Sequence, residues 1–103
     1  MEMQMATLIA TYEVTDPLTF AGAFDEFQSV RTEHGALAHR LFRGESDRTT
    51  FVVNIDFPSV AAAEAFTADP RRARALQDGT VTSSHDLLVE EVDHGAAADG
   101  EPR

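Results

Sequence analysis

No cysteine, lysine or tryptophan occurs in this chain of 103 residues. Without cysteine, disulfide bonds, thiol nucleophiles, iron–sulfur clusters and cysteine-bound zinc are excluded. Without lysine, the Schiff-base chemistry of ordinary pyridoxal-phosphate enzymes is excluded as well. All eight basic residues are therefore arginines. The four histidines have no metal-binding spacing on any one expected element, so we expect no metal site.

The charge of the chain is strongly one-sided. Its formal net charge is −10, which argues against a nucleic-acid partner because phosphate backbones require a clustered basic surface. The opening MEMQMATLIATYEV has neither a basic region nor a long apolar run, so it predicts no signal peptide and no membrane span. We therefore expect a cytoplasmic protein with no membrane partner.

The length predicts one domain, small enough that oligomerisation would help it to bury apolar surface. We place this domain at residues 1–92. The remaining residues, 93–103, have no hydrophobic periodicity, and we expect them to form a disordered acidic tail.

Strand and helix signals alternate along the domain. Four segments have the composition and alternation of strands: 5–14, 37–43, 51–57 and 81–92. Asp16 and Pro17 predict the start of a helix that ends at His34-Gly35. Ser59 is expected to cap a second helix, and Asp69-Pro70 to start a short further helix that stops at Gly79.

This order, βαββαβ, predicts an α+β, ferredoxin-like domain with a four-stranded antiparallel sheet and its helices on one face. The opposite face would be solvated if it stayed bare, and its strands would then alternate cleanly. Instead, pairs such as Leu8/Ile9 and Leu87/Leu88 place apolar residues on both faces. We therefore expect a homodimer in which two sheets meet face to face and enclose a cavity.

Asn54 is the first candidate for a functional side chain. Phe51, Val53, Ile55 and Phe57 alternate on one face of their strand, so Asn54 points to the other face. That face is either wet or lines a pocket. A solvated amide and a functional amide are about equally consistent with this pattern.

The stretch GALAHRLFRGESDRTTFVVNIDFPSVAAAEAF, followed by TADP and a later Gly-Thr-Val, resembles the dimeric α/β-barrel superfamily. Its antibiotic-biosynthesis-monooxygenase-like branch is the most similar, over about residues 5–92. The resemblance implies a cofactor-independent monooxygenase that acts on a polycyclic aromatic, polyketide-type molecule. The superfamily also contains cyclases, isomerases, haem-degrading enzymes and stress proteins, so the fold alone does not choose the reaction.

The resemblance also assigns residues. Phe57 stands where the family usually has a tryptophan, which makes it a candidate for substrate binding. Asn54 lies close to the asparagine of the oxygenases, and a neutral amide donor suits an oxyanion that develops on an electron-rich phenol or anthrone.

Arg40 and His39 are further catalytic candidates on the second strand. Arg40 could hold a phenolate or carboxylate by its planar fork, and His39 could act as a base near neutral pH. Adjacent residues on a regular strand point to opposite faces, so at most one of the two shares a pocket. Tyr12 and His85 are candidates for substrate binding. For each of these residues a purely structural role is an equal or stronger alternative.

A basic patch formed by Arg71, Arg72 and Arg74 is expected to offset neighbouring carboxylates.

Three functions stay open from the sequence. The first is the cofactor-independent monooxygenase, and the second is a non-oxidative cyclase or isomerase on the same fold. The third is a non-catalytic small-molecule-binding or stress dimer.

Overall fold

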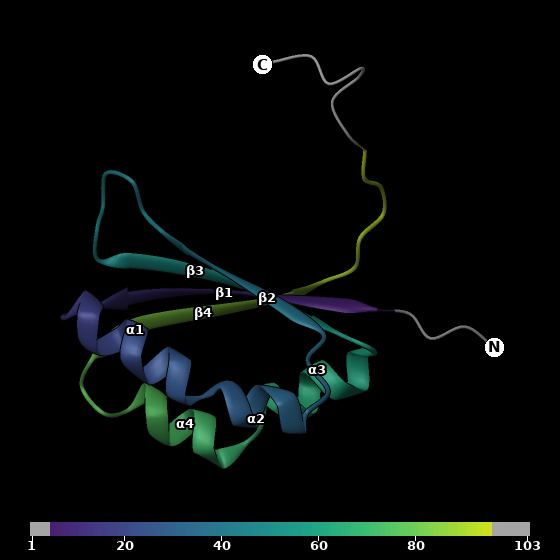
Figure 1. The fold of residues 1–103 in the computed structure, drawn as a ribbon, viewed down its shortest axis with the longest axis horizontal. Coiled ribbons are helices and arrows are strands. Elements are labelled where there is room, and N and C mark those ends of the chain that lie inside the picture. The colour runs from purple at the N-terminus through teal and green to yellow at the C-terminus, as the bar shows by residue number, and fades with distance from the viewer. Residues whose placement is uncertain (1–4, 96–103) are drawn as a thin grey trace.

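The structure of the chain is a computed structural model that describes residues 5–95. Four strands form one antiparallel sheet with the order β2-β3-β1-β4. These strands are β1 (Ala6–Val14), β2 (Ala38–Arg43), β3 (Thr50–Phe57) and β4 (Val81–Val89). The helical segments are α1 (Pro17–Glu26), α2 (Gln28–Glu33), α3 (Val60–Thr67) and α4 (Pro70–Leu76). All four helical segments lie on one side of the sheet (Figure 1), as the ferredoxin-like prediction requires.

Helix starts follow the capping residues of the sequence. The Asp16 carboxylate accepts hydrogen bonds from the amides of Leu18 and Thr19, and Pro17 occupies the first turn of α1. Ser59 caps α3 through the amide of Ala62 at 3.1 Å. Side-chain caps thus satisfy amides that a helix N-terminus leaves without a backbone partner.

The first helix is interrupted, although the sequence predicts it as continuous from Pro17 to His34. Phe27 separates α1 from α2, with ψ near 1°. Its amide is shared between the carbonyls of Ala23 and Phe24, a pattern that tightens the turn. Nη1 of Arg31 then reaches back to the carbonyl of Phe24 at 2.9 Å. This long side chain satisfies a backbone acceptor at the interruption.

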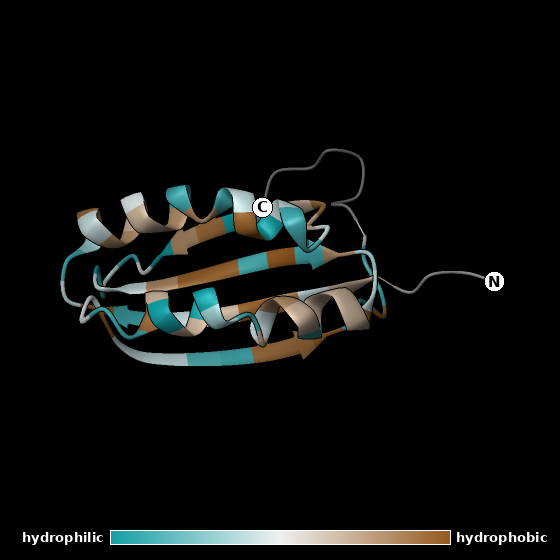
Figure 2. Ribbon diagram, turned by 90° about the horizontal axis from the view of Figure 1, so that it is seen from below, coloured by the Kyte–Doolittle hydropathy of each residue, from teal (hydrophilic) through white to brown (hydrophobic). Residues whose placement is uncertain are grey.

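The two faces of the sheet differ sharply in burial. In β1 and β3, every second side chain is buried beneath the helices, and the residues between them are only half-buried. The helices lie in two rows, α1–α2 and α3–α4, over the apolar bands of the strands (Figure 2). Leu8, Val53 and Phe57 are the largest of the fully buried side chains. The hydrophobic core therefore lies between the sheet and the helices.

The opposite side, which we call the open face, carries no helix of residues 5–95. Apolar side chains remain on it, including Leu87, which is 53% exposed, and Phe42. After β4 the chain has no helix or strand as far as Gly95, while most of the expected tail, residues 96–103, lies outside the described residues. Within the described range, no helix is long and apolar enough to cross a membrane.

Candidate functional site

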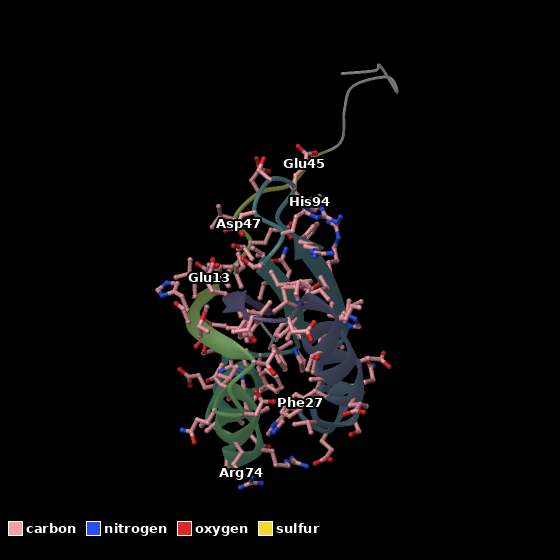
Figure 3. The ribbon with its side chains drawn as sticks, turned by 90° about the vertical axis from the view of Figure 1, so that its left-hand side faces the viewer. Glu13, Phe27, Glu45, Asp47, Arg74 and His94 are labelled. Atoms are coloured by element: carbon pink, nitrogen blue, oxygen red, sulfur yellow. The ribbon has the colours of Figure 1, made fainter. Side chains whose placement is uncertain are left out.

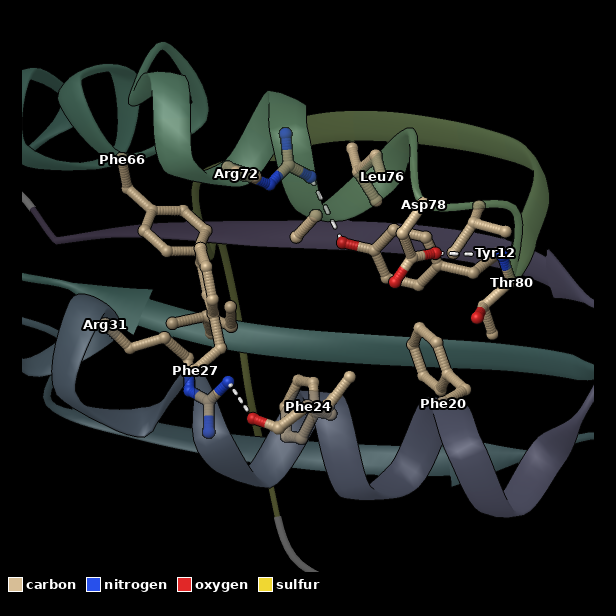
Figure 4. A pocket seen from close by; sticks show the side chains of 14 residues that line it. Tyr12, Phe20, Phe24, Phe27, Arg31, Phe66, Arg72, Leu76, Asp78 and Thr80 are labelled. Carbon is tan, nitrogen blue, oxygen red and sulfur yellow. Dashed lines mark hydrogen bonds between the residues drawn. The ribbon is translucent and has the colours of Figure 1, made fainter.

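A cavity of about 70 Å³ lies between the sheet and the two rows of helices; we call it the inner cavity. Its lining is mostly aromatic and aliphatic, and two arginines contribute to it (Figure 4). The aromatic side chains of the lining are Tyr12, Phe20, Phe24, Phe27 and Phe66. Phe27 projects between the helices toward the interior (Figure 3). Such a lining provides flat apolar surfaces for a ligand with aromatic rings.

Arg72 of α4 enters the cavity with its charge neutralised. Its side chain is 7% exposed and donates two hydrogen bonds to the carboxylate of Asp86, at 2.6 and 2.8 Å. Nη2 also donates to the hydroxyl of Tyr12 at 3.1 Å. Burial opposes the charge of Arg72, but the hydrogen bonds and charge of Asp86 and Tyr12 keep its pKa above the ordinary value. Asp86 can provide this partner because its β4 position faces the helices, opposite Ala10 of β1.

Tyr12 is consequently a hydrogen-bond donor with a polarised hydroxyl. Burial raises the pKa of its phenol above the ordinary value, although the nearby Arg72 charge opposes this shift. The phenol therefore stays protonated at neutral pH. Its oxygen already accepts from Arg72, which leaves its proton to be donated to a group in the cavity.

Arg31 of α2 is the second arginine of the lining, and it is 2% exposed. The guanidinium lies over the ring of Phe24, with Cζ 3.9 Å from the ring centroid. Nη2 donates to the side-chain oxygen of Gln28 at 3.0 Å, and Nε is buried without a hydrogen-bond partner. No carboxylate of the described chain lies within ion-pair distance of Arg31. Burial lowers its pKa, and the Asp25 charge partly offsets this effect.

The inner cavity reaches solvent at its rim. Ala23, Ala75 and Asp78 belong to the lining and are exposed. Asp78 follows α4, and one of its carboxylate oxygens accepts from the amide of Thr80 at 2.8 Å. In Figure 4, Asp78 and Thr80 lie at one end of the cavity and Arg31 at the other. The positive and negative charges of the lining are therefore separated along its length.

A second concave region, the open-face pocket, lies on the other side of the sheet and measures about 320 Å³. Asn54 and Arg40 are cross-strand neighbours in it. Asp56 also lines it, and its carboxylate accepts from the hydroxyl of Thr7 at 2.7 Å. Within residues 5–95 the side chain of Asn54 forms no hydrogen bond, so its amide is free to bind another group.

The sequence candidates divide between these regions. Asn54, Arg40 and His39 all line the open-face pocket. The parity of β2 nevertheless points the His39 ring to the helix side, where it meets Phe24 with centroids 5.4 Å apart. His85 is on the open face, opposite Thr11, and does not line the pocket.

Tyr12 and Phe57 lie on the helix side, away from Asn54. Tyr12 belongs to the inner cavity. Phe57 is 0% exposed and packs on Phe66, with ring centroids 5.4 Å apart. Phe57 lines neither pocket. Its ring therefore belongs to the hydrophobic core and does not contact a cavity.

Sequence reasoning missed Arg31, Arg72 and Asp86 as members of a polar site. Arg72 offsets a carboxylate as expected, but its partner Asp86 lies inside the fold, because only 6% of Arg72 is exposed. Arg71 does offset carboxylates, since it binds Glu33 and Asp69. The sequence did contain a signal that Arg31 is buried. Phe20, Phe24, Phe27 and Arg31 recur at helical spacing, so Arg31 shares the side of the helix that faces the core. In the described part of the chain, no cluster of three or more His, Asp or Glu side chains is arranged to hold a metal ion.

No protein-family model and no curated protein sequence matches the chain. Solved structures do match it. SnoaB, a cofactor-independent oxygenase from Streptomyces nogalater, superposes with a TM-score of 0.76 at 19% identity, covering 88% of this chain and 96% of its own. The chain shares its ferredoxin-like fold.

Two further structures extend this likeness. An antibiotic biosynthesis monooxygenase gives a TM-score of 0.69 at 21% identity, over 85% of this chain and 99% of its own. The NE2512 protein of Nitrosomonas europaea gives 0.72 at 17% identity, over 95% and 99%. The resemblance to antibiotic-biosynthesis-monooxygenase-like proteins is therefore confirmed for the fold, while identities this low leave the reaction to be argued from the site.

Proposed function

We propose that this protein is a cofactor-independent monooxygenase whose aromatic substrate binds in the inner cavity. The observation that carries the proposal is the Tyr12–Arg72–Asp86 arrangement inside an aromatic lining. It combines a flat apolar surface with a protonated phenol that a buried ion pair holds in place. The likeness to SnoaB, whose description is that of a cofactor-independent oxygenase, supports the same class.

The chemistry suited to this cavity is oxidation of an electron-rich phenol or anthrone by dioxygen. An activated CH2 group loses a proton, and the resulting anion gives an electron to dioxygen. A carbon–oxygen bond then forms, the peroxide takes up a proton, and loss of water leaves a carbonyl. One CH2 group and one dioxygen thus become one carbonyl and one water, so no external reductant is needed.

The residues of the cavity serve these steps. The positive charge of Arg31 stabilises the substrate anion, and its effect is strong because the surroundings are apolar. The Tyr12 hydroxyl donates to the developing peroxide oxygen. Asp78 at the rim is a carboxylate that can accept the proton lost from carbon.

The assembly that we propose is a homodimer in which the open faces of two copies meet. The exposed apolar side chains of this face, such as Leu87 and Phe42, support it because large exposed apolar surfaces mark interfaces. The open-face pocket would then lie between the two sheets. In this arrangement Asn54, Arg40 and His85 form part of the interface, and a site shared there by the two copies is the alternative to the inner cavity.

Oxygen uptake with 1,8-dihydroxyanthrone tests the function and chooses between the two pockets. We expect the purified protein to consume oxygen and to form the anthraquinone, which is followed by its absorbance. Tyr12→Phe should lower the rate by about a hundredfold, because a positioned donor to an oxyanion contributes on that scale. The matched variant Asn54→Ala, on the other face of the sheet, should retain the wild-type rate.

The opposite pattern, loss with Asn54→Ala and none with Tyr12→Phe, would move the reaction to the open-face pocket. Consumption of the anthrone without oxygen uptake would instead support the non-oxidative alternative. Absence of any turnover while ligands still bind would reject an enzymatic role in favour of a binding protein. Circular dichroism of each variant checks that the fold is intact.

A further inference from the structure

The two arginines of the inner cavity differ in how their charge is balanced. Arg72 has a bidentate carboxylate partner in Asp86. Arg31, although more deeply buried, has only neutral acceptors, the carbonyl of Phe24 and the side-chain oxygen of Gln28. No carboxylate of residues 5–95 lies within ion-pair distance of it, and the Asp25 charge acts on it only from farther away. A buried cation without a counter-ion is costly, so proteins normally pair such groups.

The unfilled donor of Arg31 lies on the edge of the guanidinium that suits an oxyanion. Nε–H and one Nη–H of an arginine lie side by side and together bind a carboxylate with two parallel hydrogen bonds. In this protein Nε is buried without a partner, and Nη2 is held only by the neutral amide of Gln28. Gln28 is exposed, so an incoming oxyanion can replace its side chain at little cost.

The rest of the lining determines what the anion must be attached to. Phe24 and Phe27 lie beside Arg31 and continue the cavity toward Phe20 (Figure 4). At the far end the Asp78 carboxylate repels a negative group at the rim. A flat apolar ligand with one negative group at the end that lies near Arg31 fits this distribution of charge.

We infer that the inner cavity selects a planar aromatic oxyanion, a carboxylate or a phenolate, and that Arg31 holds its negative group. This inference rests on the inner cavity as the site of the proposed function and names its substrate class. The cavity of about 70 Å³ is smaller than the ~150 Å³ cavity known to take up benzene. The ring system must therefore extend through the exposed rim or displace α4, a wall of only seven residues.

Binding of 2-naphthoate, compared with its neutral isostere 2-naphthamide, tests the inference without any turnover. Isothermal titration should show that wild-type protein binds the anion about tenfold to hundredfold more tightly, the range expected for hydrogen bonds between charged groups. The intrinsic fluorescence gives the location. Tyr12 is the only tyrosine and tryptophan is absent, so quenching of the tyrosine emission, corrected for the absorbance and emission of the naphthalene ring, reports on the inner cavity.

Arg31→Met should remove the preference for the anion and keep the weak binding of the amide. Arg74→Met is the matched control because it makes the same change of charge. Arg74 is exposed and lies on the side of α4 away from the sheet (Figure 3). Equal affinities of wild type for the two compounds, no binding of naphthoate at millimolar concentration, or an unchanged preference in Arg31→Met would each overturn the inference. The wild-type comparison stands even if Arg31→Met does not fold.

Failure of the proposed function is distinguishable from failure of this inference. A strong preference for naphthoate without oxygen uptake from any anthrone would reject the monooxygenase and leave the anion site in place. Oxygen uptake together with equal binding of 2-naphthoate and 2-naphthamide would support the monooxygenase and reject the anion site.

Discussion

Removing the carboxylate of Asp86 should destabilise the protein far more than an ordinary surface change. Asp86→Ala deletes two hydrogen bonds of 2.6 and 2.8 Å to a guanidinium that is 7% exposed. Breaking a fully buried pair from one side costs about 3–5 kcal/mol, because the remaining charge stays uncompensated. The Asp86 side chain is 35% exposed, so water recovers part of this loss and we expect about 2–3 kcal/mol.

This prediction is checked by urea unfolding followed by far-ultraviolet circular dichroism, at one fixed protein concentration. In thermal unfolding of a domain of about 100 residues, the same loss of stability lowers the melting temperature by roughly 10–20 °C. Glu64→Ala is the control, since Glu64 is exposed on α3 and should change the free energy of unfolding by less than about 0.5 kcal/mol.

A second variant separates the charge from the packing. Arg72→Met together with Asp86→Ala removes both members of this ion pair, and replacement of an ion pair by apolar groups is often neutral or stabilising. The double variant should therefore recover much of the stability lost in Asp86→Ala. A change below about 0.5 kcal/mol in Asp86→Ala would refute the reasoning, because Arg72 would then be compensated in some other way.

Two further predictions concern the assembly and the pH dependence. Wild-type protein should sediment as a dimer at micromolar concentration and Leu87→Glu as a monomer, while the control Leu18→Glu on α1 stays dimeric; a monomeric wild type would contradict the open-face interface. The Arg71 guanidinium, with His34, holds the pKa of Asp69 well below its ordinary value. Because the folded-state pKa is the lower one, Asp69 stabilises the protein above its unfolded pKa of about 3.9, and this contribution is lost as pH falls below that value. Asp69→Asn should thus be less stable than wild type at pH 7, and the difference in melting temperature should shrink at pH 3; a constant difference would contradict the assignment.

The fold could be predicted because local signals agree along most of the chain. Period-two alternation marks β1 and β3, and the caps at Asp16, Ser59 and Asp69 begin the helices where the structure has them. The main error lies at Phe27, where a continuous helical stripe conceals an interruption. Nothing local signals this break, since its stabilising contact comes from Arg31 in the next turn.

The candidate site was less predictable, for a physical reason that Asn54 illustrates. Strand parity correctly places Asn54 away from the helices, because side-chain direction on a regular strand depends only on the residue count. Whether that direction leads to solvent, a pocket or a second copy depends on groups outside the strand. Arg40 could likewise be separated from His39 by parity, but the contact of His39 with Phe24 required the packed helix.

The polar centre of the inner cavity escaped prediction because its members are far apart in sequence. Tyr12, Arg72 and Asp86 come from β1, α4 and β4, and only the sheet order and helix packing bring them together. One clue was nevertheless present. Asp86 shares its parity in β4 with Leu88, which packs on the core, so a carboxylate is directed toward a buried layer. A charge in that position requires a partner, and Arg72, which the sequence predicts to offset a carboxylate, is the side chain that reaches and neutralises it. Arg31, on the core side of the first helix, is also a buried charge. No carboxylate of the described residues lies within ion-pair distance of it, and a ligand anion in the cavity would be its partner.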